Sequence, residues 1–485
     1  MVDEVLDRLE EVLQKIPFNL NKDQLGFILE YIRGKGHFSL LGTAGVGKSV
    51  IIQVLKLYYE DEMVLSAASG VANQGLCDGK GGDGTTHKVM SLPFYLGDQK
   101  AIQKVNRTCS AIFAGSDLVK HICIDEAYMH NPEHLMVILK RLERFNKKTA
   151  KRGRRNIRLL FVGDPCQLGS ILSDKDKEYL LETYGSHLMF ESNVWRDFSP
   201  TIRVLSKVER QKDKTFTAFL EVLRYGQEDR YEGALKWINK RVNYNYDNSK
   251  FTVATYLKTV NAVNTKVLNS MTTQKYVSKA VVTGDFNFKE NGVEEEITLC
   301  EGLECITTVN DKNGDFSNGS FCTITMVTPH EGCYCLFHHS GKEVFVPIHE
   351  YEQVESYVEG NVVNEDGTKG KDILKRKVVG TCHQHCLLQA SSFSGYRSQG
   401  RTFNKEGVLD IGWGFDKSKD FGKNALYVMA SRWVSVDQIT LPRPLEVKHI
   451  HVCRPSIDFW QQCVKEQEDY ELTEELGRLL KVKDA

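Results

Sequence analysis

The chain has 485 residues, of which 41% are hydrophobic and 26% charged, with 38 Gly and 10 Pro. This is the composition of a soluble globular protein with room for about three domains, which excludes a single small binding module and a disordered or fibrous chain. The formal net charge of -1 neither indicates nor excludes a nucleic-acid partner, because a groove can be basic while the whole chain is neutral. The thirteen cysteines are an odd number scattered through apolar stretches, which favours free thiols in a reducing compartment.

Targeting and membrane signals are missing from the amino-acid pattern. No apolar run reaches the eighteen residues of a membrane span, and the acidic start of the chain is unlike a signal or transit peptide. We therefore expect no membrane partner. The expected location is the cytoplasm for a bacterial or phage protein, with the nucleus as the alternative for a protein of a eukaryote or its virus.

An amphipathic helix is predicted at residues 1–19, because apolar residues from Val2 to Ile16 recur at intervals of three and four. After it, short apolar runs bounded by Gly, Asp or charged residues alternate with helical stretches. This is the pattern of buried strands in a parallel sheet covered by helices. The runs are 38–41, 64–65, 122–124, 159–162 and 202–205. They predict a first α/β domain at 20–228.

A second α/β pattern is predicted at 229–304 and 387–455, starting with a strand at 251–257 and ending in the apolar segment 425–429. The stretch between its two parts, 305–386, is rich in β-branched and aromatic residues and carries turn signals such as Asn313-Gly314. It predicts a small antiparallel β module inserted in the second domain. Residues 456–485 are predicted to form a charged helical tail.

One segment is strongly basic. Between Lys140 and Arg158 lie ten Lys or Arg residues and the single acid Glu143. Two interpretations stay open here: a solvated helix end with its loop, or a nucleic-acid contact or nuclear targeting signal.

A phosphate-binding loop is predicted between the strand ending at Leu41 and a helix beginning near Val50. The segment matches GxxxxGK[ST] in the strand-to-helix context that this pattern requires. Its glycines let backbone N–H groups surround phosphate oxygens, the lysine adds a point charge and the serine hydroxyl ligates Mg²⁺. The residues are Gly42, Thr43, Ala44, Gly45, Val46, Gly47, Lys48 and Ser49.

An ATPase of this kind also needs a second Mg²⁺ ligand and a group that activates water. Asp125 and Glu126 follow the buried run 122–124, so Asp125 is the predicted metal ligand and Glu126 the predicted general base. Gln167 follows another strand, where its amide could hydrogen-bond the γ-phosphate. The alternatives are a helix cap for the acidic pair and a turn-stabilising side chain for Gln167.

Three further residues lie at positions suited to nucleotide binding. Gln24 lies just upstream of the loop and could pair with the adenine edge. Arg210 and Arg432 follow or end apolar segments far from the loop, and an arginine delivered onto the γ-phosphate stabilises transition-state charge. Taken singly, each arginine could equally form a surface ion pair.

Together these segments resemble the motif series of superfamily 1B helicases, and within that group the Pif family and its phage relative Dda. The resemblance covers roughly residues 20 to 435. It rests on Leu20–Gln24, Gly42–Ser49, Ser66–Ala72, Gly84–His87, Ile124–Ala127, Gly163–Leu168, Glu209–Gln211, Ser398–Thr402 and Tyr427–Arg432.

The resemblance implies a DNA helicase with two RecA-like domains that moves 5′ to 3′ on single-stranded DNA and binds ATP between them. It gives Gln167 the role of γ-phosphate sensor, Arg210 and Arg432 the role of arginine fingers, and Gln24 the adenine contact. It adds Gly400 to the nucleotide-binding residues and implies that the β module is SH3-like. The DNA-facing residues that it implies are Ser69, Thr86, His87, Ser398 and Gln399.

A small wedge insertion is implied near 84–115, with Phe94 as the aromatic side chain that parts the duplex; a buried core aromatic is the alternative. The sequence departs from the family pattern at Tyr396-Arg397, where relatives carry His-Lys, although an aromatic residue and an arginine can both bind a strand. Gly169-Ser170 replaces Pro-Pro and Ala127-Tyr128 replaces Ile-Ser. All groups with a charge or hydrogen-bonding role in hydrolysis are present.

A zinc site is a further hypothesis, because the β module concentrates soft ligands. Their spacing lacks paired Cys-x-x-Cys, and alternating strand residues explain Cys333 and Cys335 equally well. The candidate ligands are Cys333, Cys335, His338, His339, Cys382, His383, His385 and Cys386.

The sequence therefore predicts a monomeric, ATP- and Mg²⁺-dependent DNA helicase. Its expected partners are single-stranded DNA, duplex or fork DNA, and replication or single-strand-binding proteins. The alternatives are an RNA helicase of superfamily 1B, and a P-loop kinase or nucleotide-gated interaction protein without unwinding. The last class leaves Arg210, Gln399 and Arg432 unexplained.

Overall fold

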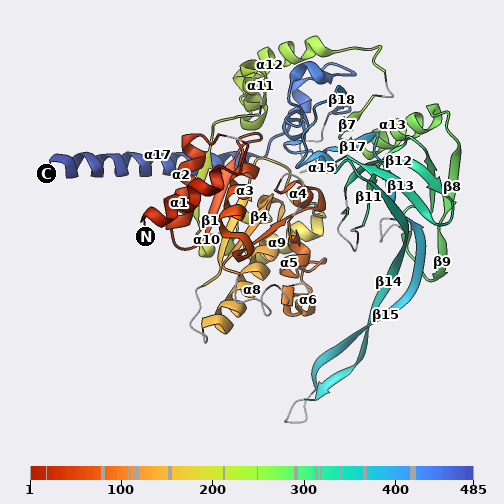
Figure 1. The fold of residues 1–485 in the computed structure, drawn as a ribbon, viewed down its shortest axis with the longest axis horizontal. Coiled ribbons are helices and arrows are strands. Elements are labelled where there is room, and N and C mark those ends of the chain that lie inside the picture. Colours follow the sequence, from red (N-terminus) through yellow and green to blue (C-terminus); the bar gives the residue numbers. More distant parts are fainter. Residues whose placement is uncertain are drawn as a thin grey trace. The chain divides into compact units, whose positions relative to one another are not determined.

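The computed structural model describes residues 2–17, 19–77, 82–106, 109–110, 112, 119–150, 156–210, 213–247, 250–288, 293–309, 311, 315–316, 319–338, 340–363, 369–414 and 422–483. The chain divides into two compact units (Figure 1). The core unit comprises Met1–Val260 and Phe393–Ala485, and the inserted unit comprises Asn261–Ser392.

The first sheet of the core unit has six strands in the order β3-β2-β4-β5-β1-β6, and its neighbouring strands are parallel. The strands are β1 (Phe38–Gly42), β2 (Met63–Ala67), β3 (Gly84–Thr85), β4 (His121–Asp125), β5 (Arg158–Gly163) and β6 (Thr201–Leu205). Each of the five apolar runs that we predicted as strands lies in one of them. β1 and β2 are buried along their whole length, as strands covered on both faces must be.

Helices cover both faces of this sheet. One buried cluster joins α1, α2 and α3 to the sheet, and a second cluster joins α8, α10 and α17 to it. In chain order the helices before β6 are α1 (Val2–Leu13), α2 (Lys22–Arg33), α3 (Lys48–Tyr59), α4 (Gly70–Gly75), α5 (Thr86–Met90), α6 (Gln99–Gln103), α8 (Pro132–Ala150), α9 (Asp174–Tyr184) and α10 (Asn193–Phe198). The predicted N-terminal helix is α1, which buries Leu9 and Val12.

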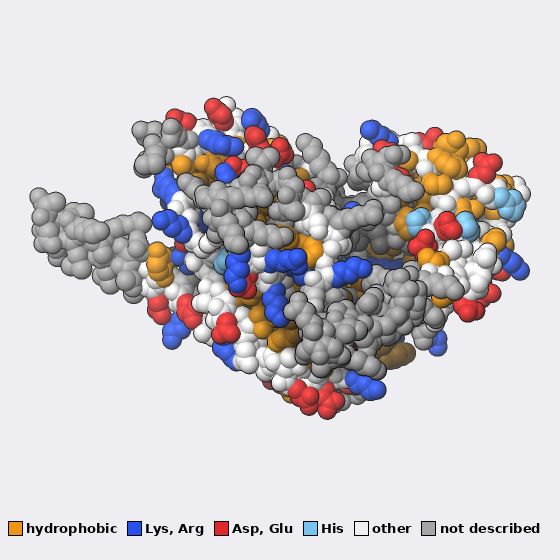
Figure 2. Space-filling model, turned by 90° about the horizontal axis from the view of Figure 1, so that it is seen from below, with side chains coloured by type: hydrophobic (Ala, Val, Ile, Leu, Met, Phe, Trp, Pro, Cys, Tyr) orange, Lys and Arg blue, Asp and Glu red, His pale blue; other side chains and the backbone are white. Residues whose placement is uncertain are grey.

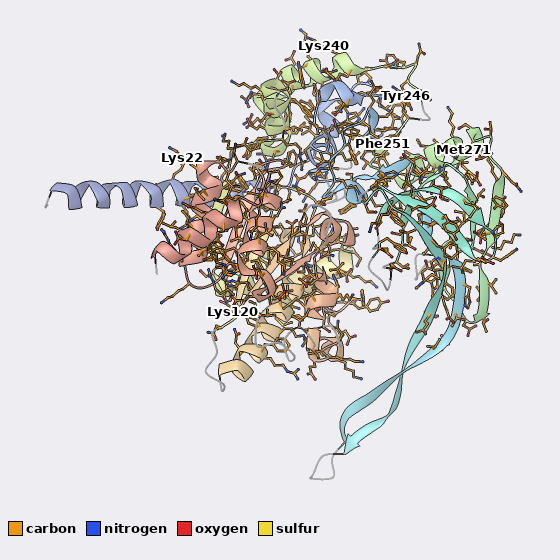
Figure 3. All side chains as sticks on the ribbon, viewed as in Figure 1. Lys22, Lys120, Lys240, Tyr246, Phe251 and Met271 are labelled. Atoms are coloured by element: carbon orange, nitrogen blue, oxygen red, sulfur yellow. The ribbon has the colours of Figure 1, made fainter. Side chains whose placement is uncertain are left out.

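The second sheet has the order β17-β7-β18-β19, and β18 pairs in parallel with β7 and β19. Phe251, labelled in Figure 3, directly precedes β7 and packs its ring against Phe393, Phe403 and Trp433. The strands are β7 (Thr252–Ala254), β17 (Ser392–Ser394), β18 (Gly407–Asp410) and β19 (Ile439–Thr440). The helices are α11 (Lys214–Tyr225), α12 (Tyr231–Ile238), α13 (Leu257–Ser270), α15 (Gly395–Ser398), α16 (Ala425–Ala430) and α17 (Arg454–Lys483).

One element of this half is shorter than predicted, and a second is an apolar segment for which the sequence predicted no element type. The strand predicted at 251–257 is only Thr252–Ala254, because α13 already begins at Leu257. The apolar segment 425–429 is the helix α16, all six residues of which are buried. A short buried run has no periodicity that separates strand from helix.

The inserted unit is antiparallel, as predicted, but larger than 305–386. Its main sheet has the order β16-β11-β12-β13-β14-β15-β9, and β8 pairs with β10. Since β9 pairs with β15, residues 261–304 belong to this unit and not to the second α/β domain. The strands are β8 (Lys275–Lys279), β9 (Val281–Gly284), β10 (Glu296–Cys300), β11 (Glu304–Thr307), β12 (Phe321–Thr328), β13 (Gly332–Phe337), β14 (Glu343–Val363), β15 (Lys369–His385) and β16 (Leu387–Gln389).

The longest pairing of the inserted unit is the hairpin of β14 and β15, which Figure 1 shows extending beyond the rest of its sheet. The description of this unit as SH3-like stays a prediction. In β13, Cys333 and Cys335 face the interior while Tyr334 and Leu336 face outward. Strand alternation therefore accounts for the two cysteines. Across the described chain, no three His, Cys, Asp or Glu side chains form a group that could hold a metal ion; His339 lies outside the described residues.

Charges of both signs are interspersed over the face shown in Figure 2. This matches the formal net charge of -1. None of the described helices combines the length and the apolarity that crossing a bilayer requires.

Candidate active site

The phosphate loop connects β1 to α3, as its sequence predicts. Gly45 and Gly47 have φ values of +83° and +85°, in the left-handed region that favours glycine. Gly47 also caps α3 without a side-chain hydrogen bond to the first turn. The N–H groups at the start of α3 are therefore available to an anion, where the helix dipole favours negative charge.

Lys48 opens α3 and is held by the loop itself. Its Nζ donates to the carbonyl oxygens of Gly42 (2.8 Å) and Thr43 (3.0 Å). Burial lowers the pKa of Lys48, and nearby carboxylates, Asp164 first, oppose that shift. The ammonium thus lies in a pocket that already contains compensating negative charge.

The acidic pair lies where β4 ends. The Oδ1 atom of Asp125 accepts a hydrogen bond from the Glu126 N–H (2.9 Å). Glu126 has a φ of +50°, a left-handed conformation that is strained for a residue with a side chain. Burial, and then the charge of Glu126, raise the pKa of Asp125. Two buried carboxylates side by side are a favourable environment for a divalent cation.

Two arginines approach from distant segments. Arg210 follows β6, and its backbone N–H and that of Glu209 both donate to the Gly45 carbonyl (3.1 and 2.8 Å). Arg432 follows α16, and its guanidinium donates to Val428 O (2.9 Å) and Ser431 Oγ (3.0 Å). Burial, and then the charge of Arg432, lower the pKa of Arg210 to about 10. Two like charges brought together by the fold favour an anionic ligand.

These groups line one cavity of about 340 Å³ in the core unit. It contains all six predicted catalytic residues and Gly400 from the second sheet. The lining residues are Ala44, Gly45, Gly47, Lys48, Ser49, Val50, Ala72, Asp125, Glu126, Gln167, Glu209, Arg210, Gly400 and Arg432. The Oε1 atom of Gln167 is buried without a hydrogen-bond partner in the described structure, which leaves an acceptor for a ligand. The hydroxyl of Ser49 and the carboxylate of Asp125 are hard oxygen donors that fit Mg²⁺.

Gln399 was predicted to face DNA, but the structure brings its side chain to the carboxylate of Glu126. Its Nε2 atom donates to Glu126 Oε2 (3.4 Å), and its Oε1 atom is buried without a partner among the described residues. The reason is that Gln399 follows the end of α15, and the chain there turns into the cavity lined by Gly400.

Gln24 does not present a free amide to the cavity. Its Oε1 accepts from the Asn21 N–H (2.9 Å) in a capping box at the start of α2, and its Nε2 donates to Val46 O (2.9 Å). The predicted adenine contact is thus used to connect α2 to the phosphate loop. An added Cβ at Gly47 would lie 2.3 Å from Gln24 Nε2, which shows how closely the two segments approach.

The predicted DNA-facing residues are divided between interior and surface. Ser69 caps α4 by accepting from the Ala72 N–H (3.1 Å). Thr86 and Ser398 are fully buried, and Ser398 donates to Gly395 O (2.7 Å). Both hydroxyls therefore face the protein interior.

Arg397 is exposed and Tyr396 is half-buried beside it. Phe94 is 87% exposed, so the alternative of a buried core aromatic is wrong. The ring of His87 stacks on that of Phe94, with centroids 5.7 Å apart. The side chains of Tyr396, Arg397, His87 and Phe94 remain candidates for binding a DNA strand.

The basic segment 140–158 has a partly structural role. Arg141 is buried and donates to the Lys104 carbonyl (2.6 Å), while Lys147 pairs with Glu143 on the surface (2.5 Å). Residues 151–155 of this segment lie outside the described residues.

One group of residues near the site has no counterpart in the prediction. The hydroxyl of Tyr427 in α16 accepts from the Ala44 N–H (3.2 Å) and donates to Asp164 Oδ2 (3.1 Å). Asp164 also forms a fully buried ion pair with Arg224 (2.7 Å). Tyr427 and Asp164 both lie in recognised motifs, but residues 263 positions apart give no spacing signal of their contact.

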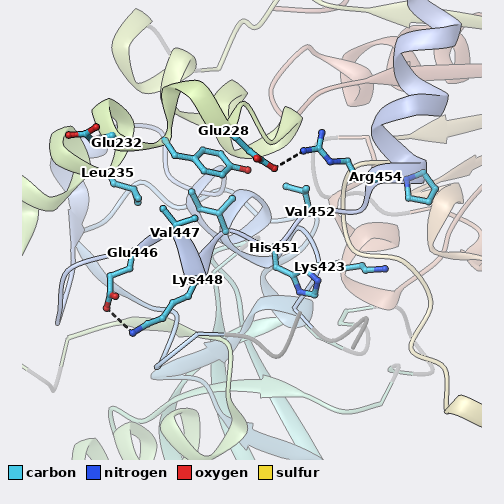
Figure 4. Close-up of a pocket in the computed structure, with 13 residues that line it drawn as sticks. Glu228, Glu232, Leu235, Lys423, Glu446, Val447, Lys448, His451, Val452 and Arg454 are labelled. Atoms are coloured by element: carbon cyan, nitrogen blue, oxygen red, sulfur yellow. Dashed lines mark hydrogen bonds and ion pairs between the residues drawn. The ribbon is translucent and has the colours of Figure 1, made fainter. Parts of the chain in front are cut away.

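A larger cavity of about 1010 Å³ lies between α12 and the segment 446–455 (Figure 4). Four of its charged groups form two ion pairs, Glu228 with Arg454 (3.0 Å) and Glu446 with Lys448 (2.8 Å). It lacks the converging cations and carboxylates of the smaller cavity. Volume alone therefore does not identify the active site.

Comparison with known proteins agrees with this geometry. A model of the family described as PIF1-like helicase matches residues 19–232. The ATP-dependent DNA helicase RRM3 of Saccharomyces cerevisiae is 24% identical over 334 residues, covering 65% of this chain and 43% of that protein. The ATP-dependent DNA helicase PIF1 of Danio rerio is 26% identical over 214 residues, covering 43% of this chain and 30% of that protein. The chain thus matches less than half the length of these curated relatives.

The fold is shared more widely than the sequence. The structure of Bacteroides Pif1 bound to single-stranded DNA superposes with a TM-score of 0.76 at 18% identity, covering 93% of this chain and 98% of that chain. The fold prediction of two RecA-like parallel sheets is therefore confirmed. Residues 19–232 thus resemble PIF1-like helicases, and the curated relatives and the shared fold agree with this similarity.

Proposed function

We propose that this chain is an ATP-dependent DNA helicase that moves 5′ to 3′ along single-stranded DNA and unwinds duplex DNA in replication, recombination or repair. The observation that carries the proposal is the cavity in which the phosphate loop and acidic pair meet Gly400 and Arg432. A domain that only bound nucleotide would not need an arginine from a second sheet. The curated relatives are named DNA helicases, and the similar Bacteroides structure contains single-stranded DNA.

ATP binding follows from the loop. The N–H groups at the start of α3 and the Lys48 ammonium bind the phosphates, and Ser49 and Asp125 would hold Mg²⁺. A Mg²⁺ ion held by these two side chains would supply positive charge that offsets the charge of the bound phosphates. Gln24 holds the phosphate loop through its hydrogen bond to Val46 O instead of contacting the adenine.

Hydrolysis then uses the side chains that surround the γ-phosphate. Glu126 accepts a proton from the water that attacks the γ-phosphorus, the bond to the β–γ bridging oxygen breaks, and ADP and phosphate are released. Gln399 donates to Glu126 and so fixes the direction of the carboxylate. Arg210 and Arg432 stabilise the charge that spreads over the transferring oxygens.

Movement on DNA follows from the short distance in sequence between two sites. Arg397 is exposed on α15, whereas Gln399 and Gly400 lie at the nucleotide. A change at the γ-phosphate is therefore transmitted over three residues to a strand held by Tyr396 and Arg397. We propose that Phe94 stacks at the junction and parts the duplex.

The proposal includes partners and location. We propose a monomer that acts on forked DNA beside replication or single-strand-binding proteins. It would act in the cytoplasm of a bacterium or infected bacterium, or in a eukaryotic nucleus.

The test is ATP hydrolysis with and without a short single-stranded DNA, beside an RNA of the same sequence, with Glu126→Gln as the inactive control. We expect at least tenfold stimulation by DNA over RNA, and unwinding of a duplex with a 5′ tail but not a 3′ tail. Equal stimulation by both polymers would favour an RNA helicase. Turnover that ignores both polymers would favour a kinase or nucleotide-gated protein.

A further inference from the structure

The segment between α5 and α6 presents two neighbouring aromatic side chains to solvent. Phe94 is 87% exposed and Tyr95 is 68% exposed, while Leu92 beside them is buried. A single exposed apolar side chain is ordinary, but two adjacent rings on an anchored turn are not explained by packing. We call residues 94–95 the aromatic tip.

The backbone behind the aromatic tip is held by one carboxylate. Glu133, in the first turn of α8, accepts from the Gly97 N–H through both oxygens (2.9 and 3.2 Å). The hydroxyls of Tyr179 (2.7 Å) and Tyr184 (3.2 Å) in and at the end of α9 donate to its Oε2. Glu133 is fully buried. A buried carboxylate is tolerated only when hydrogen bonds satisfy it, so these donors form a fixed set.

The same helix holds the carbonyl side of the segment. Arg141 lies eight residues after Glu133, about two helical turns later and on a similar face. Its buried guanidinium donates to the carbonyl oxygen of Lys104 (2.6 Å), with longer contacts to those of Ser91 and Ala101 (3.4 Å each). α8 therefore holds the segment through the Gly97 N–H and the carbonyls of Ala101 and Lys104 after the tip, and through the carbonyl of Ser91 before it.

The ring of Phe94 in the aromatic tip also packs against a histidine side chain. Phe94 stacks on His87 with an interplanar angle of 20°, and His134 meets the edge of His87 at 4.9 Å. His134 in turn forms a hydrogen bond with the backbone of Pro93. The exposed ring thus rests on side chains that are themselves fixed.

We propose that Glu133 is a positioning residue for strand separation, which fixes the aromatic tip so that the first base pair of the duplex meets a rigid aromatic edge. A mobile tip would have to be ordered each time it stacked on a base. The entropy cost of that ordering would reduce the net stacking free energy that is available to separate the base pair. The inference rests on the proposed helicase function. It concerns unwinding alone, since Glu133 lies outside the residues that line the nucleotide cavity.

The experiment uses the full chain and compares three measurements. These are single-turnover unwinding of a 5′-tailed duplex, the translocation rate on single-stranded DNA, and DNA-stimulated ATP hydrolysis. The first variant, Glu133→Gln, keeps the shape of the side chain but replaces one acceptor oxygen with an N–H donor. The second, Tyr179→Phe, removes the hydroxyl that donates the shortest hydrogen bond to Glu133. Each is also made in a Phe94→Ala background. Glu182→Gln, an exposed carboxylate on α9, is the matched control.

We expect Glu133→Gln and Tyr179→Phe to lower the unwinding rate at least fivefold, with translocation and ATP hydrolysis within twofold of wild type. In the Phe94→Ala background neither change should lower unwinding further, because both act through the same ring. If Glu133→Gln does not fold, Tyr179→Phe carries the test alone.

Three results would overturn the inference. One is unwinding within twofold of wild type in both variants. Another is a parallel fall of unwinding, translocation and hydrolysis, which would mean a role in the motor. The third is a further loss in the Phe94→Ala background. A wild-type protein that neither responds to DNA nor unwinds it overturns the proposed function itself, and that is seen before any variant is made.

Discussion

At the scale of single residues, the carboxylate of Glu126 contacts a side chain from the other sheet. The amide of Gln399 donates to it over 3.4 Å, and the amide oxygen is left buried and unpaired in the described structure. A buried acceptor without a donor is costly and recurs at functional sites. In the proposed hydrolysis, the amide oxygen of Gln399 would accept a hydrogen bond from the attacking water, while Glu126 accepts the other proton of that water.

We therefore expect Gln399→Ala to lower kcat for DNA-stimulated ATP hydrolysis at least tenfold, while Kd for single-stranded DNA stays within twofold. Steady-state kinetics and fluorescence anisotropy with a labelled oligonucleotide measure the two quantities. Gln462→Ala, an exposed glutamine on α17, is the control. A Kd raised fivefold or more with kcat unchanged would restore the DNA-facing role that the motif resemblance implied.

The sequence could group most of the residues that line the candidate cavity because they lie at or after the ends of strands in one parallel sheet. Lys48 and Gln167 follow β1 and β5, Asp125 is the last residue of β4, and carboxyl ends of parallel strands share one edge. Gln24 and Gln399 could not be assigned correctly, because both stand beside the right loops and differ only in where the side chain points. That direction is set by contacts with distant residues.

At the scale of elements, the C-terminal helix α17 is a structural part of the first sheet. Gln467 forms two hydrogen bonds with the backbone of Val204 on β6, the last strand of the sheet (2.7 and 3.3 Å). A side-chain amide thus occupies the place of a neighbouring strand, which protects an open edge. About two helical turns earlier, the ring of Trp460 lies 3.8 Å from the guanidinium of the buried Arg224.

Removing the ring of Trp460 should weaken the packing of α17 against the rest of the core unit. We expect Trp460→Ala, at a side chain only 2% exposed, to lower the free energy of unfolding of the first transition by about 3–5 kcal/mol, because it leaves a cavity and uncovers a buried cation. Urea unfolding followed by circular dichroism measures it. Gln462→Ala on the exposed side of α17 should change it by less than about 0.5 kcal/mol. A loss below about 1 kcal/mol would mean that α17 is only loosely attached.

The elements themselves were predictable where periodicity was strong. Five strands of the first sheet contain short apolar runs that alternate with helical stretches along the chain, and this alternation is the pattern of a parallel sheet covered on both faces. The inserted unit was underestimated because β8 and β9 are short and contain no fully buried residue: β8 alternates between exposed and half-buried side chains, and β9 is exposed throughout. Their assignment follows from the strands with which they pair, and pairing is not local in sequence.

At the scale of the whole molecule, the core unit uses two sheets to build one cavity. Segments at the ends of strands of the first sheet supply the phosphate loop, acidic pair and Arg210, and the segments after α15 and α16, which belong to the half with the second sheet, supply Gly400 and Arg432. The hydroxyl of Tyr427 further connects α16 to the loop through Ala44 and to Asp164. A nucleotide that contacts both sheets stabilises one arrangement of them over others.

Nucleotide and DNA must then influence each other by equal factors. The exposed Arg397 and the cavity-lining Gly400 are three residues apart, so an arrangement selected by ATP also selects the position of α15. We expect a non-hydrolysable ATP analogue to change Kd for single-stranded DNA at least fivefold, which corresponds to about 1 kcal/mol of coupling. DNA should change Kd for the analogue by the same factor, because the two binding steps form a thermodynamic cycle. Fluorescence anisotropy measures Kd for DNA, and calorimetry measures Kd for the analogue. Arg432→Ala should bring both coupling factors toward one, while Kd for DNA in the absence of the analogue stays unchanged. A coupling factor below two in the wild-type protein would mean that the shared cavity does not communicate with the strand.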